Sequence, residues 1–128
     1  MLKQRAWLAA LLSAIALLLT LALPLDAGEP LTMHVSPHRS FAPANLSVRV
    51  HIQPDASNRI LEIVADSSGF YRSSQVPLDG DQAPRTIVVE FRAVPGGEYD
   101  VYGVLTTTSG RRVVVRQEAN VIASPMDR

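Results

Sequence analysis

Residues 46–52, Leu-Ser-Val-Arg-Val-His-Ile, alternate apolar and polar side chains without interruption. Successive side chains of a β-strand point to opposite faces, so this period of two predicts a strand with one face in a core and the other in water. Leu46, Val48, Val50 and Ile52 are the predicted inward residues. The stretch therefore indicates a sheet that covers a hydrophobic core on one side.

Shorter runs rich in valine, isoleucine, threonine and tyrosine lie on both sides of this strand, and segments containing proline or glycine separate them. Helical periodicity is absent beyond Leu25. This arrangement predicts an all-β domain in which short strands pair as a sandwich. Residues 70–76 are expected at a sheet edge, and residues 41–44 as a proline-rich connection. The predicted strands are residues 31–35, 46–52, 59–66, 70–76, 86–92, 99–107 and 111–122.

Residues 95–101, Pro-Gly-Gly-Glu-Tyr-Asp-Val, precede an alternating run, Ser109-Gly110 and a valine-rich last strand. This pattern resembles the final hairpin of bacterial immunoglobulin-like and fibronectin-type-III-like domains, over roughly residues 31–122. The resemblance implies a seven-stranded antiparallel immunoglobulin-like sandwich, here preceded by one N-terminal apolar helix. It also implies that Tyr99 forms a tyrosine corner, with its hydroxyl bonded to nearby backbone. The cysteine pair and core tryptophan of antibody-type domains are missing.

The N-terminal segment, residues 1–27, has the pattern of a signal peptide or a signal-anchor transmembrane helix. Lys3 and Arg5 precede an uncharged, mostly apolar run from Ala6 to Leu25. The run is long enough to span a bilayer, yet small residues near its end also offer cleavage sites, so retention and removal both stay open. In either case the sandwich, residues 28–123, is expected outside the cytoplasm, with residues 124–128 as a C-terminal tail.

Composition narrows the function classes. The chain has no cysteine, and its 12 basic and 12 acidic residues give a formal net charge of +0. No concentrated basic patch points to nucleic acid, because the adjacent pair Arg111-Arg112 follows a predicted turn. No nucleophile elbow and no phosphate-binding glycine loop is found, so we predict a protein that is not an enzyme, with no catalytic residues and no cofactor.

Histidines and carboxylates raise the question of a metal site. His34 and His38 are four residues apart, and His51 lies on the next predicted strand, but a proline break separates the first two. Asp79-Gly80-Asp81 offers carboxylate oxygens, although Asp-Gly is ordinary turn chemistry. Three surface histidines and a turn are the favoured interpretation, and no metal is predicted.

The two exteriors of the predicted sandwich differ in polarity. Placing residues 59–66, 99–107 and 111–122 in one sheet makes one exterior more apolar than a water-facing sheet normally is, whereas the other is polar. A contiguous apolar exterior is typical of a contact surface. The predicted partner-binding residues are Ile60, Val64, Tyr102, Val104 and Val114, and the polar exterior comprises Ser47, Arg49, His51, Thr86, Glu90 and Arg92.

These observations favour a non-enzymatic, exported, membrane-tethered accessory or structural domain that binds a protein partner, as a small subunit of an envelope or membrane complex would. The domain would lie on the periplasmic or extracellular side of the cytoplasmic membrane. The alternative is a cleaved periplasmic or secreted module that binds a carbohydrate or small ligand. Its predicted ligand-binding residues are Phe70, Tyr71 and Arg72.

Overall fold

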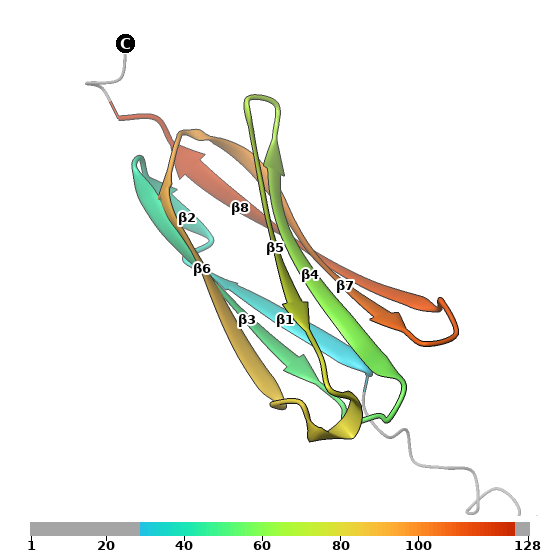
Figure 1. Cartoon of the computed structure of the whole chain (residues 1–128). Coiled ribbons are helices and arrows are strands. Elements are labelled where there is room, and N and C mark those ends of the chain that lie inside the picture. Colours follow the sequence, from blue (N-terminus) through green and yellow to red (C-terminus); the bar gives the residue numbers. More distant parts are fainter. Residues whose placement is uncertain (1–28, 125–128) are drawn as a thin grey trace, which may run out of the picture.

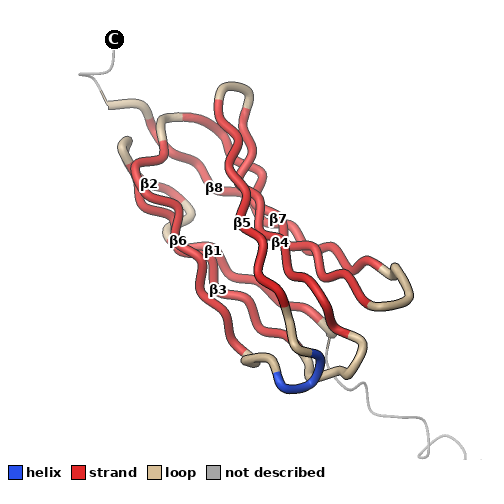
Figure 2. The backbone as a smooth tube through the Cα atoms, in the orientation of Figure 1, coloured by secondary structure: helices blue, strands red, loops and turns tan. Residues whose placement is uncertain are grey.

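The computed structural model describes residues 29–124, which fold as two β-sheets packed face to face (Figures 1 and 2). The predicted all-β sandwich is therefore confirmed at this level. The predicted N-terminal helix and the C-terminal tail from Pro125 lie outside the described residues. In chain order the elements are β1 (Leu31–Ser36), β2 (Arg39–Phe41), β3 (Ala44–Ile52), β4 (Asn58–Ser67), β5 (Phe70–Pro77), the 3-10 helix η1 (Gly80–Gln82), β6 (Thr86–Val94), β7 (Gly97–Thr107) and β8 (Arg112–Ile122).

The smaller sheet has the order β1-β3-β6, and the larger has the order β2-β8-β7-β4-β5. As predicted, the strands from the middle and the end of the chain, β4, β7 and β8, are neighbours in one sheet, and β5 lies at its edge. Within residues 29–124, no helix is long and apolar enough to cross a bilayer.

The core lies between the sheets and follows from the alternation along each strand. In β3 the inward residues Leu46, Val48 and Val50 are fully buried, whereas Arg49 and His51 are exposed, as the sequence predicts. β4 and β7 add inward residues from the opposite sheet, and Val101 is also fully buried. Burial of these aliphatic side chains supplies the main driving force for folding in a chain without disulfides.

The sequence pattern does not predict β2, and the expected number of seven strands is wrong. β2 falls within the connection that contains Pro37 and Pro43, and it pairs in parallel with β8, with Ser40 opposite Val121. The larger sheet is therefore mixed rather than purely antiparallel. Three residues are too short to display a period of two, and their partner strand lies at the far end of the chain, so local pattern contains no signal for this pairing.

Gln117 on β8 connects the two sheets. Its Oε1 accepts a hydrogen bond from the Val35 backbone N–H at 2.9 Å, and its Nε2 donates to the Met33 carbonyl, also at 2.9 Å. Both groups belong to β1, an edge strand of the smaller sheet, whose backbone would otherwise lack partners on that side. The side-chain amide thus replaces the peptide group of a neighbouring strand and closes one side of the sandwich.

Tyr99 forms the expected tyrosine corner. Its hydroxyl donates a hydrogen bond to the Pro95 carbonyl at 2.7 Å, while its ring is almost completely buried. Phe70 from β5 packs against this ring edge to face, with centroids 5.8 Å apart. The corner therefore fixes the turn before β7 and anchors the edge strand β5 to the core.

A β-bulge interrupts the pairing of β3 with β6 where Asn45 lies. Ala93 has a φ of 55°, the one positive φ at a non-glycine position in residues 29–124, and the Asn45 Oδ1 accepts a hydrogen bond from its N–H at 3.1 Å. A Cβ in this left-handed region costs about 1–2 kcal/mol. The Asn45 side chain offsets part of this cost by satisfying the N–H that the bulge removes from the ladder.

Replacement of the bridging amide should destabilise the domain. We expect Gln117→Ala to lower the free energy of unfolding by about 2–3 kcal/mol, because two hydrogen bonds are lost and two edge groups of β1 remain without partners. Gln75→Ala is the matched control, since Gln75 bonds only the exposed Glu62 side chain, at 2.9 Å. Chemical denaturation measures both values, and an equal effect of the two substitutions would contradict the bridging role of Gln117.

Relief of the left-handed strain should stabilise the domain. We expect Ala93→Gly to raise the free energy of unfolding by about 0.5 kcal/mol, because the strain removed exceeds the extra chain entropy of glycine. Ala56→Gly, at an exposed turn position without a positive φ, should lower it. Thermal and chemical denaturation of both variants give the comparison, and a loss of stability in Ala93→Gly would rule out significant strain at this bulge.

Candidate functional site

The outer face of the larger sheet carries the partner-binding residues that were predicted from the sequence. The register places Val64 opposite Tyr102 and Val104 opposite Val114, so these side chains from β4, β7 and β8 lie on adjacent positions of one face. Ile60 lies on the same face of β4, opposite Thr106. We call this surface the docking face; it comprises the outward side chains of β4, β5, β7 and β8.

The five predicted partner-binding residues differ in accessibility. Val114 is 59% exposed and Ile60 is 40% exposed, whereas Val64 and Val104 are buried and Tyr102 is half-buried. β4 and β7 are flanked by strands on both sides, so taller neighbouring side chains shield the two inner valines. Val64 and Val104 therefore form the floor of the face, and Ile60, Tyr102 and Val114 are the residues that a partner would touch. Their binding role stays a prediction.

Charged side chains border the apolar part of the docking face and also interrupt it, because Glu62 lies between Ile60 and Val64 on β4, opposite Val104. Towards one end, Asp66 lies opposite Asp100, and Asp100 lies opposite Glu118 across the next strand pair. On β8, Arg112 and Arg116 lie beside Thr106 and Tyr102. Arg92 and Glu90 on the smaller sheet form the single ion pair within residues 29–124, at 3.5 Å, so the charges on the docking face have no such partners there.

Tyr102 has an unusual environment on this face. Partial burial raises the pKa of its hydroxyl above the ordinary value of 10.0. The neighbouring Tyr71 hydroxyl and the Asp66 and Glu62 carboxylates contribute in the same direction, because each disfavours a further negative charge. Tyr102 therefore stays protonated over a wider pH range than a free tyrosine and presents a hydrogen-bond donor at the centre of the face.

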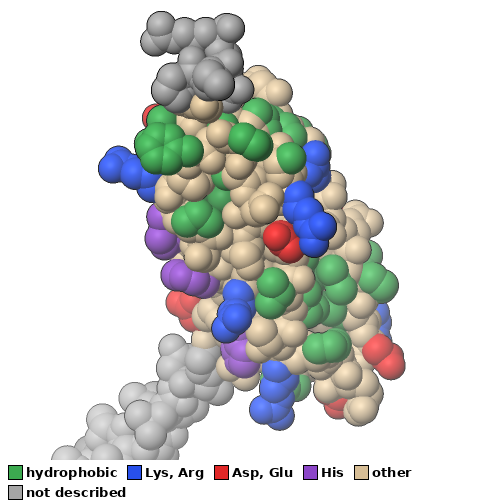
Figure 3. Space-filling model, turned by 90° about the vertical axis from the view of Figure 1, so that its left-hand side faces the viewer, with side chains coloured by type: hydrophobic (Ala, Val, Ile, Leu, Met, Phe, Trp, Pro, Cys, Tyr) green, Lys and Arg blue, Asp and Glu red, His purple; other side chains and the backbone are tan. Residues whose placement is uncertain are grey.

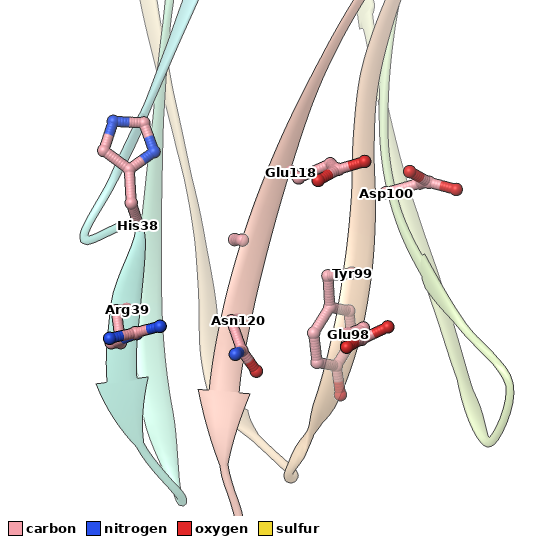
Figure 4. Close-up of a pocket in the computed structure, with 8 residues that line it drawn as sticks. His38, Arg39, Glu98, Tyr99, Asp100, Glu118 and Asn120 are labelled. Carbon is pink, nitrogen blue, oxygen red and sulfur yellow. The ribbon is translucent and has the colours of Figure 1, made fainter.

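A shallow groove of about 580 Å³ continues the docking face towards β2. Figure 4 shows His38 and Arg39 on one side of the groove and the carboxylates of β7 on the other, with side chains of β8 between them. Sequence reasoning missed this groove, because β2 is not predicted and only its pairing with β8 brings His38 and Arg39 to this face. The groove is lined by His38, Arg39, Glu98, Tyr99, Asp100, Glu118, Ala119 and Asn120.

The alternative ligand-binding residues do not converge. Phe70 packs on the core residue Tyr99, and the Arg72 guanidinium lies 5.0 Å from the Phe70 ring centroid. Arg72 Nη1 also donates to the Arg92 carbonyl of β6 at 3.0 Å. Tyr71 lies on the opposite side of β5, exposed on the docking face. A strand directs neighbouring side chains to opposite faces, so these three residues cannot form one pocket.

The histidines occupy exposed positions on the side of the molecule that carries β2, β3 and β6, among scattered charged and apolar side chains (Figure 3). The rings of His34 and His38 lie edge to face with centroids 5.4 Å apart. His51 is opposite Thr32, two positions along β1 from His34. Asp81 lies in the 3-10 helix that follows Asp79. In the described part of the chain, no three histidine or carboxylate side chains form a cluster suited to a metal.

No protein-family model and no curated protein matches the sequence. The fold is similar to that of superoxide reductase (neelaredoxin) from Ignicoccus hospitalis, with 15% identity, 73% of this chain and 80% of that chain covered, and a TM-score of 0.59.

Two further structures share the fold with 15% identity. A family 76 glycoside hydrolase from a bovine Bacteroides thetaiotaomicron strain matches with a TM-score of 0.52, covering 74% of this chain and 21% of that chain. The PmoD soluble domain from Methylocystis sp. ATCC 49242 (Rockwell) matches with a TM-score of 0.50, covering 71% of this chain and 90% of that chain. At this identity the similarity establishes the β-sandwich alone, because one fold supports many functions.

The raised pKa of Tyr102 gives a testable pH dependence. Its folded-state pKa exceeds the unfolded value near 10.0, so its contribution to stability is complete below pH 10 and is lost as the pH rises through the raised pKa. In an ultraviolet titration of the three tyrosines, Tyr102→Phe should remove a component above pH 10. Tyr71→Phe should instead shift that component to lower pH. An unchanged titration in Tyr102→Phe would contradict this assignment.

Proposed function

We propose that this chain is a non-enzymatic, exported accessory domain that binds a partner protein through the docking face. In this proposal residues 1–27 tether it to the cytoplasmic membrane, and it serves as a small subunit of an envelope or membrane complex. The observation that carries the proposal is the register that gathers Ile60, Tyr102 and Val114 on one outward face. Exposed apolar side chains gathered on one face among charged side chains are typical of protein contact surfaces.

The borders of the docking face define the chemistry of the partner. Tyr102 supplies a hydrogen-bond donor among the apolar side chains of the face. At the end of the face nearest β2 lie the carboxylates of Asp66, Asp100 and Glu118. Arginines lie along β8. A complementary partner would present an apolar centre, basic residues facing these carboxylates and acidic residues facing Arg112 and Arg116. Such complementarity raises association rates and fixes the orientation of the two proteins.

The tether rests on the sequence alone. Lys3 and Arg5 before an apolar run of this length favour an anchor with the sandwich outside the cytoplasm. The immunoglobulin-like assignment is likewise our proposal, which the tyrosine corner of Tyr99 supports. The ligand-binding module stays the alternative proposal; of its three residues, Phe70 and Arg72 lie on one side of β5 and Tyr71 on the other.

Because the chain contains no cysteine, single cysteines can report on the docking face in cells. We expect Val114→Cys to be protected from a membrane-impermeant maleimide in spheroplasts of the host and to react fully after purification. His51→Cys, exposed on the outer face of the smaller sheet, is the matched control and should react in both states. Labelling is measured by intact mass.

The same samples separate the parts of the proposal. Equal labelling of the two variants in cells would contradict docking through this face. Failure to label His51→Cys in spheroplasts would contradict export. A full-length mass of 13.9 kDa in alkaline-washed membranes is expected for a retained anchor, whereas a shortened mass in the soluble fraction would contradict the tether.

A further inference from the structure

The two sheets have four edge strands, of which three are protected against pairing with another chain. Gln117 bonds the open backbone groups of β1, and β2 has only three residues. On β5, the exposed Arg72 side chain lies on the same side of the strand as Phe70 and bonds the Arg92 carbonyl of β6, and a charge in this position discourages strand addition. β6 is the fourth edge, and its sequence from Thr86 to Phe91 is rich in β-branched and apolar residues.

The open backbone groups of β6 can be assigned from its pairing with β3. The Ile52 N–H donates to the Arg85 carbonyl at 2.8 Å, so odd-numbered residues of β6 direct their backbone groups to β3. By the alternation of an antiparallel ladder, Thr86, Val88 and Glu90 direct theirs to the open edge. The Arg72 side chain bonds the Arg92 carbonyl. This agrees with the assignment, because Arg92 is also even-numbered and its carbonyl is therefore expected at the open edge.

We propose that a second copy of this chain pairs antiparallel with β6, with Val88 at the two-fold axis. Each hydrogen-bonded pair, Val88 with Val88 and Thr86 with Glu90, would then exchange two backbone bonds across the axis. The smaller sheets of the two copies would form one continuous sheet. This surface differs from the docking face, and the inference does not depend on the proposed function.

The ends of the open edge are complementary in the same register. Pro84 has no N–H, and the Arg92 carbonyl is already occupied by Arg72. With the axis at Val88, Pro84 of one copy lies opposite Arg92 of the other. Pro84, which lacks an N–H, therefore lies opposite a carbonyl that already accepts a hydrogen bond from Arg72. In this register neither position leaves a backbone group without a partner. The open edge is therefore complementary to a second copy of itself in this register.

The side chains agree with this register. Val88 is 54% exposed on the outer face and would contact its symmetry mate, while the Thr86 hydroxyl can donate to the Glu90 carboxylate. On the inner side, Ile87 and Val89 are only partly buried, and the pairing places each opposite the other across the axis. No like charges face each other, because Glu90 pairs with threonine.

Cysteine cross-linking tests both the dimer and its register. In a hydrogen-bonded antiparallel pair the two Cα atoms are about 5.5 Å apart, which suits a disulfide. We expect Val88→Cys in the full-length chain, in mild detergent, to form a disulfide dimer at least about tenfold faster than Val114→Cys, because paired thiols react at a high effective concentration. Val114 is the matched control, as an equally exposed valine on the other sheet.

Sedimentation of the unmodified chain completes the test. It should show a concentration-dependent dimer that Val88→Lys abolishes while circular dichroism shows an unchanged fold. A monomer at every concentration, or equal cross-linking of the two cysteine variants, would overturn the proposal. Protection of Val88→Cys from maleimide in cells, combined with a monomeric purified chain, would assign the edge to a strand of another protein and would also overturn it.

Discussion

The bridge from Gln117 to β1 is the constraint on which the arrangement of the two sheets depends. Apolar burial between two sheets is non-directional, whereas hydrogen bonds of 2.9 Å from Gln117 to Met33 and Val35 fix the position of β1 relative to β8. On that side of the molecule the fold is closed almost as in a barrel. On the opposite side Arg72 reaches from β5 to the Arg92 carbonyl, and the rest of the β6 edge is open. The two sides of this domain are therefore chemically distinct. On the β1 side the Gln117 amide bonds the edge strand, whereas on the β6 side the edge strand can contact another chain.

Much of this architecture is encoded in local pattern. The strict alternation of residues 46–52 predicts both the strand and its buried side, and the same logic applied to β4 and β7 places Val64 and Tyr102 on one face. The tyrosine corner at Tyr99 was expected from the resemblance of residues 95–101 to the last hairpin of immunoglobulin-like domains, and the hydrogen bond to Pro95 is present. These features could be predicted because each depends on neighbours within a few residues, where a period of two or a turn motif is decisive.

The remaining features depend on contacts between distant parts of the chain. β2 exists because β8 offers it an edge, and three residues between prolines give no pattern of their own. The groove lined by Arg39 could not be predicted either, because it depends on the pairing of β2 with β8. The period of two that places Val114 outside also places Gln117 on the inner face of β8, but local pattern does not show which backbone groups of β1 it bonds. The separation of Tyr71 from Phe70 and Arg72, in contrast, was implicit in the period of two that had been applied to every other strand.

The order of synthesis gives the bridge a further consequence. β1 and β2 are made first, yet β8, which supplies Gln117 and pairs with β2, is made last. The first strands must therefore wait for almost the whole chain before their edges are satisfied, and long-range pairing of this kind forms slowly because loop closure precedes any gain from contacts. The pairs β1–β3 and β4–β5 can form earlier, but the side of the sandwich closed by Gln117 is completed only after β8 has been made.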